Sequence, residues 1–323
     1  MIEIAIASGK GGVGKSTLAA SLLIILKERG WNVIGVDADA DAPNLHLILG
    51  INKWDNITSF SDSKVAEIID EKCIKCGECI KACPHGAIYI DDQGRYIVNQ
   101  VYCEGCVTCK LVCPVKDAIT YHKVDTGIIR EGYTEYGFKI ISARLRPGRP
   151  NSGKIVTEEK ERARQYIEKD GILVVDSAAG IGCQVISSLA GANMTILITE
   201  PTPAGFSDFK RIHKLTRHFM QPTALVINKY DTNQELTNEI IEYAKKWHID
   251  LLGMIPYDDA IPYSMARMKP VIIEYPDSES SKAIKEIALK VDNILRNWTK
   301  WMVEYRPKKP EPYKPILIKP KET

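Results

Sequence analysis

Short apolar segments alternate with amphipathic ones along most of the chain. Residues 15–29 carry apolar side chains at helical spacing before Gly30 ends the pattern, and a second apolar stripe runs along 281–305. Apolar segments of strand length are predicted as strands at 2–7, 32–36, 172–175, 194–199, 224–227 and 251–255. Because strands and helices alternate over 2–298, we expect an α/β fold with a doubly wound, mainly parallel sheet.

The stripe at 281–305 has two interpretations. It fits a final helix that packs on the core, or an amphipathic helix that lies on a membrane surface. Its polar face carries charges of both signs and further chain follows it, so core packing is preferred.

A glycine-rich loop joins the first predicted strand to the first predicted helix. Its sequence is Gly9-Lys10-Gly11-Gly12-Val13-Gly14-Lys15-Ser16-Thr17, which matches the phosphate-binding pattern G-x4-G-K-[ST]. The glycines let backbone N–H groups surround phosphate oxygens, Lys15 reaches the terminal phosphates, and Ser16 faces a magnesium ion. The predicted nucleotide-binding residues of the loop are Gly11, Gly12, Val13, Gly14, Lys15, Ser16 and Thr17.

Composition and charge narrow the class of protein. With 323 residues, of which 45% are hydrophobic, the chain is long enough to bury a sizeable core. No apolar run approaches the length of a membrane-spanning helix, and no signal peptide is recognised, so a cytoplasmic location is expected. The net charge of +2 gives no electrostatic reason to expect nucleic acid as the main partner.

Eight of the nine cysteines form two copies of one spacing. The first copy is Cys73-x2-Cys76-x2-Cys79-x3-Cys83-Pro84, and the second is Cys103-x2-Cys106-x2-Cys109-x3-Cys113-Pro114. The run is similar to that of bacterial two-cluster ferredoxins, in which the fourth cysteine of each run ligates the other cluster. The resemblance implies two [4Fe-4S] clusters, with cluster I on Cys73, Cys76, Cys79 and Cys113 and cluster II on Cys103, Cys106, Cys109 and Cys83.

Two other uses of these cysteines stay open. Structural zinc sites usually pair two-cysteine knuckles or include histidine, and disulfides need an oxidising compartment. Neither pattern matches a duplicated four-cysteine run that ends in proline, so the clusters are the preferred interpretation. The ninth cysteine, Cys183, is expected to be a small buried residue at the start of a helix. The alternative is a ligand of a cluster shared across a dimer axis, by resemblance to the nitrogenase iron protein, but two Cys183 thiols would supply only two of four ligands.

The complete loop, with its additional lysine Lys10, resembles the deviant Walker A loop of the MinD/ParA/Mrp superfamily. In that family this lysine reaches across a dimer to the nucleotide of the partner. The resemblance therefore implies a homodimeric ATPase in which Lys10 and Lys15 are catalytic.

Two acidic residues extend the resemblance. Asp39 is similar to the switch I aspartate that orients the attacking water or contacts magnesium, and it is expected to be catalytic. Asp176 is similar to the Walker B aspartate, with Ala178 where the family usually has proline. The implied Mg2+ site consists of Ser16, Asp39 and Asp176.

Two later segments resemble the part of the family's site that holds the base. Asn228 begins the string Asn228-Lys229-Tyr230-Asp231, and Pro256 begins Pro256-Tyr257-Asp258. The first string also resembles the guanine-reading motif of GTPases, but the habit of the superfamily favours ATP. We expect ATP and Mg2+ as ligands, with Asn228 and Pro256 in the nucleotide site.

The cysteine runs lie between the predicted switch I and Walker B segments. This order resembles MinD-superfamily P-loop ATPases that contain an inserted ferredoxin domain. We expect a discontinuous ATPase domain of residues 1–60 and 125–305, an α+β ferredoxin domain of the bacterial 2[4Fe-4S] type at 61–124, and a proline- and lysine-rich tail at 306–323. The polar segment 144–154 is expected to be a loop.

Three functions follow from these features. The preferred one is a nucleotide-gated homodimer that couples ATP binding and hydrolysis to electron transfer toward an unidentified redox or iron-sulfur acceptor protein. The first alternative is an iron-sulfur cluster assembly or carrier ATPase of Mrp type. Such carriers typically hold a labile cluster at a Cys-x-x-Cys pair in the C-terminal half, and residues 184–323 contain no cysteine. The further alternative is a MinD/ParA-like positioning ATPase.

Overall fold

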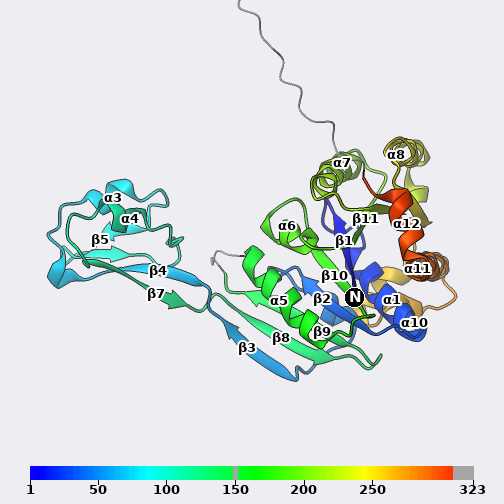
Figure 1. Cartoon of the computed structure of the whole chain (residues 1–323), viewed down its shortest axis with the longest axis horizontal. Coiled ribbons are helices and arrows are strands. Elements are labelled where there is room, and N and C mark those ends of the chain that lie inside the picture. The colour runs from blue at the N-terminus through cyan, green and yellow to red at the C-terminus, as the bar shows by residue number, and fades with distance from the viewer. Residues whose placement is uncertain (148–151, 308–323) are drawn as a thin grey trace, which may run out of the picture.

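A twisted sheet of nine strands forms the centre of the larger part of the molecule in this computed structural model (Figure 1). The structure describes residues 1–147 and 152–307. The strands from β13 to β9 run parallel, whereas β8 pairs antiparallel with β9 and β3. In spatial order they are β13 (Asp250–Ile255), β12 (Thr223–Asn228), β11 (Met194–Thr199), β1 (Ile2–Ser8), β10 (Ile172–Ala179), β2 (Val33–Ala38), β9 (Lys139–Leu145), β8 (Gly127–Tyr133) and β3 (Asn56–Phe60).

Helices cover both faces of this sheet because the central strands are apolar on both sides. Ile4 and Ile6 of β1 pack into one core, and Ala5 and Ala7 pack into another on the opposite face. Full burial of a large aliphatic side chain contributes about 1.5–3 kcal/mol. The first face carries α1 (Lys15–Glu28), α2 (Leu45–Ile48), α10 (Val271–Glu274) and α11 (Glu279–Arg296), and the second carries α5 (Ser152–Tyr166), α6 (Cys183–Leu189), α7 (Pro203–His218) and α8 (Gln234–Lys246). The predicted α/β fold with a large, mostly parallel sheet is confirmed.

The structure adds strands that the apolar pattern did not predict. β3, β8 and β9 extend the sheet beyond β2, and β3 joins it from the far side of the cysteine segment. The prediction of a loop over 144–154 is wrong at both ends. Residues up to Leu145 belong to β9, and α5 begins at Ser152. Residues 148–151 lie outside the described part, as do residues 308–323 of the expected tail.

The predicted helix over 281–305 consists of two helices. α11 ends at Arg296 and α12 (Trp298–Tyr305) follows after Asn297, whose side-chain amide donates a hydrogen bond to the Asn293 carbonyl (3.0 Å). After this turn, Trp301 of α12 is buried, and its Nε1 donates a hydrogen bond to Asp250 (2.6 Å). The apolar stripe of α11 packs on α1 and β13, which agrees with the preferred core-packing interpretation. Among the described residues, no helix has the length and apolar character needed to span a bilayer.

Residues 63–124 form a part that lies apart from the large sheet and is joined to it by its own two-stranded ribbon (Figure 1). The ribbon continues the outer strands, because Phe60 of β3 pairs with Gly127 of β8 and, just beyond, Ser63 pairs with Val124. Its strands are β4 (Ser63–Ile68) and β7 (Ile119–Val124). Between them come a 3-10 turn (Asp70–Lys72), α3 (Glu78–Ala82), β5 (Ile88–Ile90), β6 (Tyr96–Val98) and α4 (Thr108–Val112).

The repeat of the cysteine spacing is also a repeat of backbone conformation. Lys75 and Gly105 both have left-handed φ values, 59° and 65°, and so do Gly77 and Val107, at 84° and 67°. Gly77 precedes α3 and Val107 precedes α4, so each copy turns into its short helix in the same way. A β-branched residue such as Val107 adopts positive φ only at an energetic cost, which the local fold must offset.

Candidate functional site

The phosphate-binding loop lies beside a cavity of about 400 Å³ at the C-terminal ends of the parallel strands. Ligands of open parallel α/β sheets bind at this edge. α9 (Ala260–Ala266) supplies part of the opposite wall. The predicted residues that line the cavity are Gly11, Gly12, Gly14, Lys15, Ser16, Thr17, Asp39, Asn228 and Pro256.

Three of the predicted site residues do not line the cavity. Val13 is buried in the apolar core, and Asp176 is buried beneath the loop. Lys10 points to Glu200 instead. Their predicted roles in nucleotide binding, metal binding and catalysis stay predictions.

The N-terminus of α1 is shaped to receive an anion. Gly14 precedes the helix with φ +97°, and no side chain caps the first turn, which also contains no acidic residue. The free N–H groups and the positive end of the helix dipole therefore face the loop. A Cβ at Gly14 would lie 2.7 Å from Nδ2 of Asn228, so both space and conformation require glycine there.

Two buried carboxyl groups lie next to each other below the loop. Asp37 of β2 and Asp176 of β10 are paired in the sheet register, with exposed fractions of 0% and 1%. Burial, followed by the charge of Asp37, raises the pKa of Asp176 to about 7, against the opposing effects of Lys15 and Ser16. Burial also raises the pKa of Asp37.

These carboxyl groups fit a bound cation. Asp37 Oδ1, Asp176 Oδ1 and the Ser177 hydroxyl are buried without a hydrogen-bond partner among the described residues. Asp176 also interacts with the Ser16 hydroxyl, which is the predicted magnesium ligand. A hydrated Mg2+ at Ser16 would satisfy such orphan oxygens, and the oxygen donors are those that Mg2+ prefers.

Glu200 holds two lysines near the loop, although no motif marks it as a site residue. Its Oε1 lies 2.7 Å from Nζ of Lys10, and its Oε2 lies 3.3 Å from Nζ of Lys229. Burial opposes the ionisation of Glu200, but the hydrogen bonds and charges of the two lysines hold its pKa below the usual range. In this chain the signature lysine is therefore engaged within its own subunit.

The predicted base-side residues also serve to position the loop. Asn228 donates through Nδ2 to the Val13 carbonyl (2.9 Å) and accepts through Oδ1 from the Lys229 N–H (2.9 Å). Asp231, in the 3-10 turn Tyr230–Thr232, accepts a hydrogen bond from the backbone N–H of Tyr257 (2.8 Å). Both motif side chains thus tie neighbouring segments together.

Gln184 connects the two segments that resemble switches. It lies in the first turn of α6, accepts a hydrogen bond from the Ala40 N–H (3.0 Å), and donates to Asp41 (2.7 Å). A single buried amide therefore fixes the segment after β2 against the helix after β10. No motif marks this glutamine, so sequence reasoning missed it.

The eight clustered cysteines divide between two small cavities in residues 63–124. The distal cavity, named for its place toward the far end of the β4–β7 ribbon, is lined by Ile68 and Ile119. The proximal cavity is lined by Ala66 and Tyr121, which pair nearer the large sheet. The distal cavity contains Cys73, Cys76, Cys79 and Cys113, and the proximal cavity contains Cys83, Cys103, Cys106 and Cys109.

This partition is the one that crossed ligation predicts, and each set offers four thiols, the donor set of a [4Fe-4S] cluster. Over the described ranges, however, no group of three His, Cys, Asp or Glu side chains converges closely enough to hold a metal ion. Cluster binding therefore stays a prediction. The expectation for Cys183 is wrong, because it is exposed at the start of α6.

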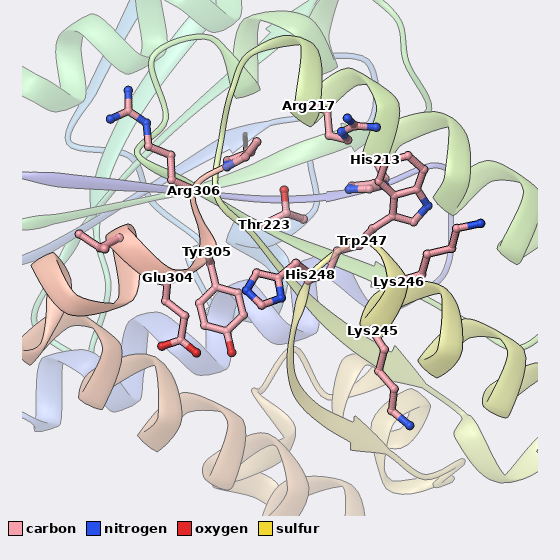
Figure 2. A pocket seen from close by; sticks show the side chains of 13 residues that line it. His213, Arg217, Thr223, Lys245, Lys246, Trp247, His248, Glu304, Tyr305 and Arg306 are labelled. Carbon is pink, nitrogen blue, oxygen red and sulfur yellow. The ribbon is translucent and has the colours of Figure 1, made fainter. Parts of the chain in front are cut away.

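A separate cavity of about 540 Å³ lies at the opposite end of β12 and β13 (Figure 2). Its walls include His213 and Arg217 of α7, and Trp247 and His248 after α8. The Arg217 guanidinium carbon is 4.2 Å from the centre of the Trp247 ring. Burial, followed by the charge of Arg217, lowers the pKa of His213 to about 4. This cavity shares no residue with the one at the loop, so it is not part of the candidate nucleotide site.

Comparisons with known proteins agree with the geometry of the loop. The sequence profile of the CobQ/CobB/MinD/ParA nucleotide binding domain matches residues 4–271. An uncharacterised protein of Methanocaldococcus jannaschii is 32% identical over 302 residues, which are 91% of this chain and 98% of that protein. The structure of the septum site-determining protein MinD complexed with Mg-ADP from Pyrococcus horikoshii is similar, with a TM-score of 0.56, 19% identity and coverage of 91% and 96%.

A more distant relative has a name that bears on the cysteines. The iron-sulfur cluster carrier protein of Aquifex aeolicus is 22% identical over 306 residues, which are 91% of this chain and 68% of that protein. These comparisons do not show a ferredoxin domain or bound clusters. They support the MinD/ParA-like alternative better than electron transfer.

The first prediction concerns Asp176. Its folded pKa of about 7 lies above the unfolded value, so the protonated form stabilises the apo protein and this stability is lost as pH rises through about 7. Mg2+ favours the charged form, so the affinity for Mg-ADP should rise about tenfold more between pH 6 and 8 in the wild type than in Asp176→Asn. Calorimetric titrations at both pH values, with exposed Asp92→Asn as control, measure this. Equal pH dependence in both proteins would contradict it.

Proposed function

Because this chain belongs to the CobQ/CobB/MinD/ParA nucleotide-binding family, we propose that it is an ATP-binding homodimer that couples ATP binding and hydrolysis to electron transfer. In this proposal residues 61–124 are an inserted ferredoxin domain. The single observation that carries the proposal is the division of eight cysteines into two cavities of four, in the crossed pattern. Two [4Fe-4S] clusters would supply one-electron storage there.

A [4Fe-4S] cluster and a single zinc ion require different arrangements of their cysteine sulfurs. A single zinc ion with Zn–S bonds of about 2.3 Å would require its four sulfurs to lie roughly 3.8 Å apart. A cube of four irons holds its thiolates farther from one another. The lack of a single-ion group among the described residues is therefore compatible with two cluster sites.

ATP hydrolysis in this proposal depends on positioning and charge. Lys15 and the free N–H groups of α1 bind the phosphates, while Ser16, Asp39 and Asp176 would hold Mg2+, which neutralises developing charge. Lys10 leaves Glu200 and reaches the nucleotide of the partner subunit, so turnover requires the dimer. The preference for ATP over GTP rests on the family, because the hydrogen bond that Asp231 accepts from the Tyr257 N–H leaves further acceptor sites on its carboxylate.

The MinD/ParA-like positioning ATPase remains a second candidate, because the family match favours it over electron transfer. The carrier alternative has less support, since the named carrier is only 22% identical and residues 184–323 contain no cysteine. Reduction potentials measured anaerobically, with and without Mg2+ and a non-hydrolysable ATP analogue, separate these functions. A change of about 60 mV corresponds to over 1 kcal/mol per electron and supports coupling. Unchanged potentials would favour the alternatives.

The second prediction tests the role of Lys10. Lys10→Ala should leave ATP affinity within about threefold of wild type but lower turnover by at least about 100-fold, because a finger supplied in trans acts on the transition state. Nucleotide binding and steady-state hydrolysis measure the two effects. Lys214→Ala, which removes an exposed lysine of α7 that does not line the nucleotide cavity, is the matched control and should retain turnover. Unchanged hydrolysis in Lys10→Ala would rule out the dimer mechanism.

The third prediction tests crossed ligation. Cys83→Ser should disturb the cluster held with Cys103, Cys106 and Cys109, whereas Cys113→Ser should disturb the other cluster. Iron and sulfide analysis with electron paramagnetic resonance of the reduced proteins measures this. If Cys83→Ser and Cys79→Ser lost the same signal, ligation would be uncrossed.

A further inference from the structure

Hydrogen bonds to sulfur distinguish the two cysteine cavities. In the proximal cavity, the Tyr121 hydroxyl lies 3.2 Å from Cys109 Sγ and the Thr108 hydroxyl lies 3.4 Å from Cys106 Sγ. A thiolate bound to iron has no proton, so these hydroxyl groups must be the donors. Two backbone N–H groups also donate there, from Ala66 to Cys103 (3.4 Å) and from Ala87 to Cys83 (3.3 Å).

In the part of the chain that the structure describes, the distal cavity has no hydroxyl donor corresponding to Tyr121 or Thr108. Among the described residues, Cys113 Sγ donates a hydrogen bond to the Val115 carbonyl (3.4 Å), which a thiolate cannot make. The backbone of Ile80 also interacts with Cys79, but the backbone of Lys110 interacts with Cys109 in the same way, so this contact does not distinguish the two sets. The distal cavity also has a tyrosine, Tyr96, but its hydroxyl donates to the Lys75 carbonyl (3.1 Å). Glu78 occupies the position that corresponds to Thr108 in the repeat, and an ionised carboxylate cannot donate.

Burial does not separate the two sets. Cys79 and Cys109, at equivalent positions of the repeat, are each 8% exposed. Cys76 and Cys106 are both exposed. Solvent access and hydrogen bonds to sulfur both set cluster potentials. Since the two sets have matched solvent access, the feature that distinguishes them is their hydrogen bonding to sulfur.

We infer that the proximal cysteine set holds the cluster of higher reduction potential, and that Tyr121 and Thr108 set this difference. The inference rests on the proposed function, because it requires two clusters. Reduction adds one negative charge to a cluster, and donors directed at its sulfurs stabilise that charge. With both clusters bound, an electron supplied to the distal set by a one-electron donor protein would pass to the proximal set, which would oxidise the distal cluster and reduce the proximal one.

The direction of this transfer is toward the ATPase. The Ala66–Tyr121 pair is two positions nearer the large sheet than the Ile68–Ile119 pair, about 7 Å along the ribbon. The proximal set would therefore hold the electron at the end of the inserted segment that adjoins β3 and β8. Tyr121 and Thr108 are positioning residues, because they act through the cysteine sulfurs.

The test is a potentiometric titration of the anaerobically prepared full chain, followed by electron paramagnetic resonance. Cys109→Ser and Cys79→Ser assign the proximal and distal signals. Two resolved potentials are expected, with the proximal one higher. Tyr121→Phe should lower the equilibrium constant for reduction of the proximal cluster about tenfold, which lowers its potential by about 59 mV for one electron. The potential of the distal cluster should not change. Tyr96→Phe is the matched control and should leave the proximal potential unchanged.

Thr108→Val provides an independent variant if Tyr121→Phe fails to assemble, and it should shift the same potential in the same direction. Equal potentials in the wild type, or a shift of the distal potential in either variant, would overturn the inference. Absence of iron and sulfide from the wild-type protein would instead reject the proposed function. The two failures are therefore distinguishable.

Discussion

The candidate nucleotide site is constrained by two adjacent buried carboxyl groups, which cannot both be ionised unless a cation is bound. Asp37 and Asp176 occupy paired positions on adjacent strands, and both are buried beneath the phosphate-binding loop. In a low-dielectric interior, two adjacent carboxyl groups are both ionised only when a cation balances their charge, and otherwise one of them keeps its proton. The segments that follow β2 and β10 therefore begin at a point whose charge state depends on what the loop has bound. Gln184 lies in the helix that follows β10 and is hydrogen-bonded to the segment that follows β2, so these segments are in direct contact.

The outer strands connect this point to the cysteine segment. β2 pairs with β9, β9 pairs with β8, and the chain runs from β7 directly into β8. Side chains follow the same route. The His46 ring nitrogen is 3.8 Å from Asp37, its ring centre is 5.4 Å from that of Trp54, and Arg130 of β8 lies 4.5 Å from the Trp54 ring centre. Contact along a path does not measure coupling, but it supplies the packed connection that coupling through the protein requires.

The sequence predicted the parts of the fold whose signal is local. The buried strands are continuous apolar runs, and the loop carries its chemistry within nine residues. β3 and β8 were missed because they pair across the whole cysteine segment and β3 is half exposed, so neither has an uninterrupted apolar run. Glu200 and Gln184 were missed for a related reason. Their partners, Lys10 and Ala40, are 190 and 144 positions away, and no local pattern reports such contacts.

Glu200 also makes the proposed movement of Lys10 energetically reasonable. A buried carboxylate that loses its only cation is strongly destabilised. Glu200 has two cations, and Lys229 can remain when Lys10 leaves. Because the Lys10 side chain is 43% exposed, its ammonium group loses little hydration in either position. The shared carboxylate thus holds the signature lysine next to the loop without binding it so tightly that a second subunit could not draw it away.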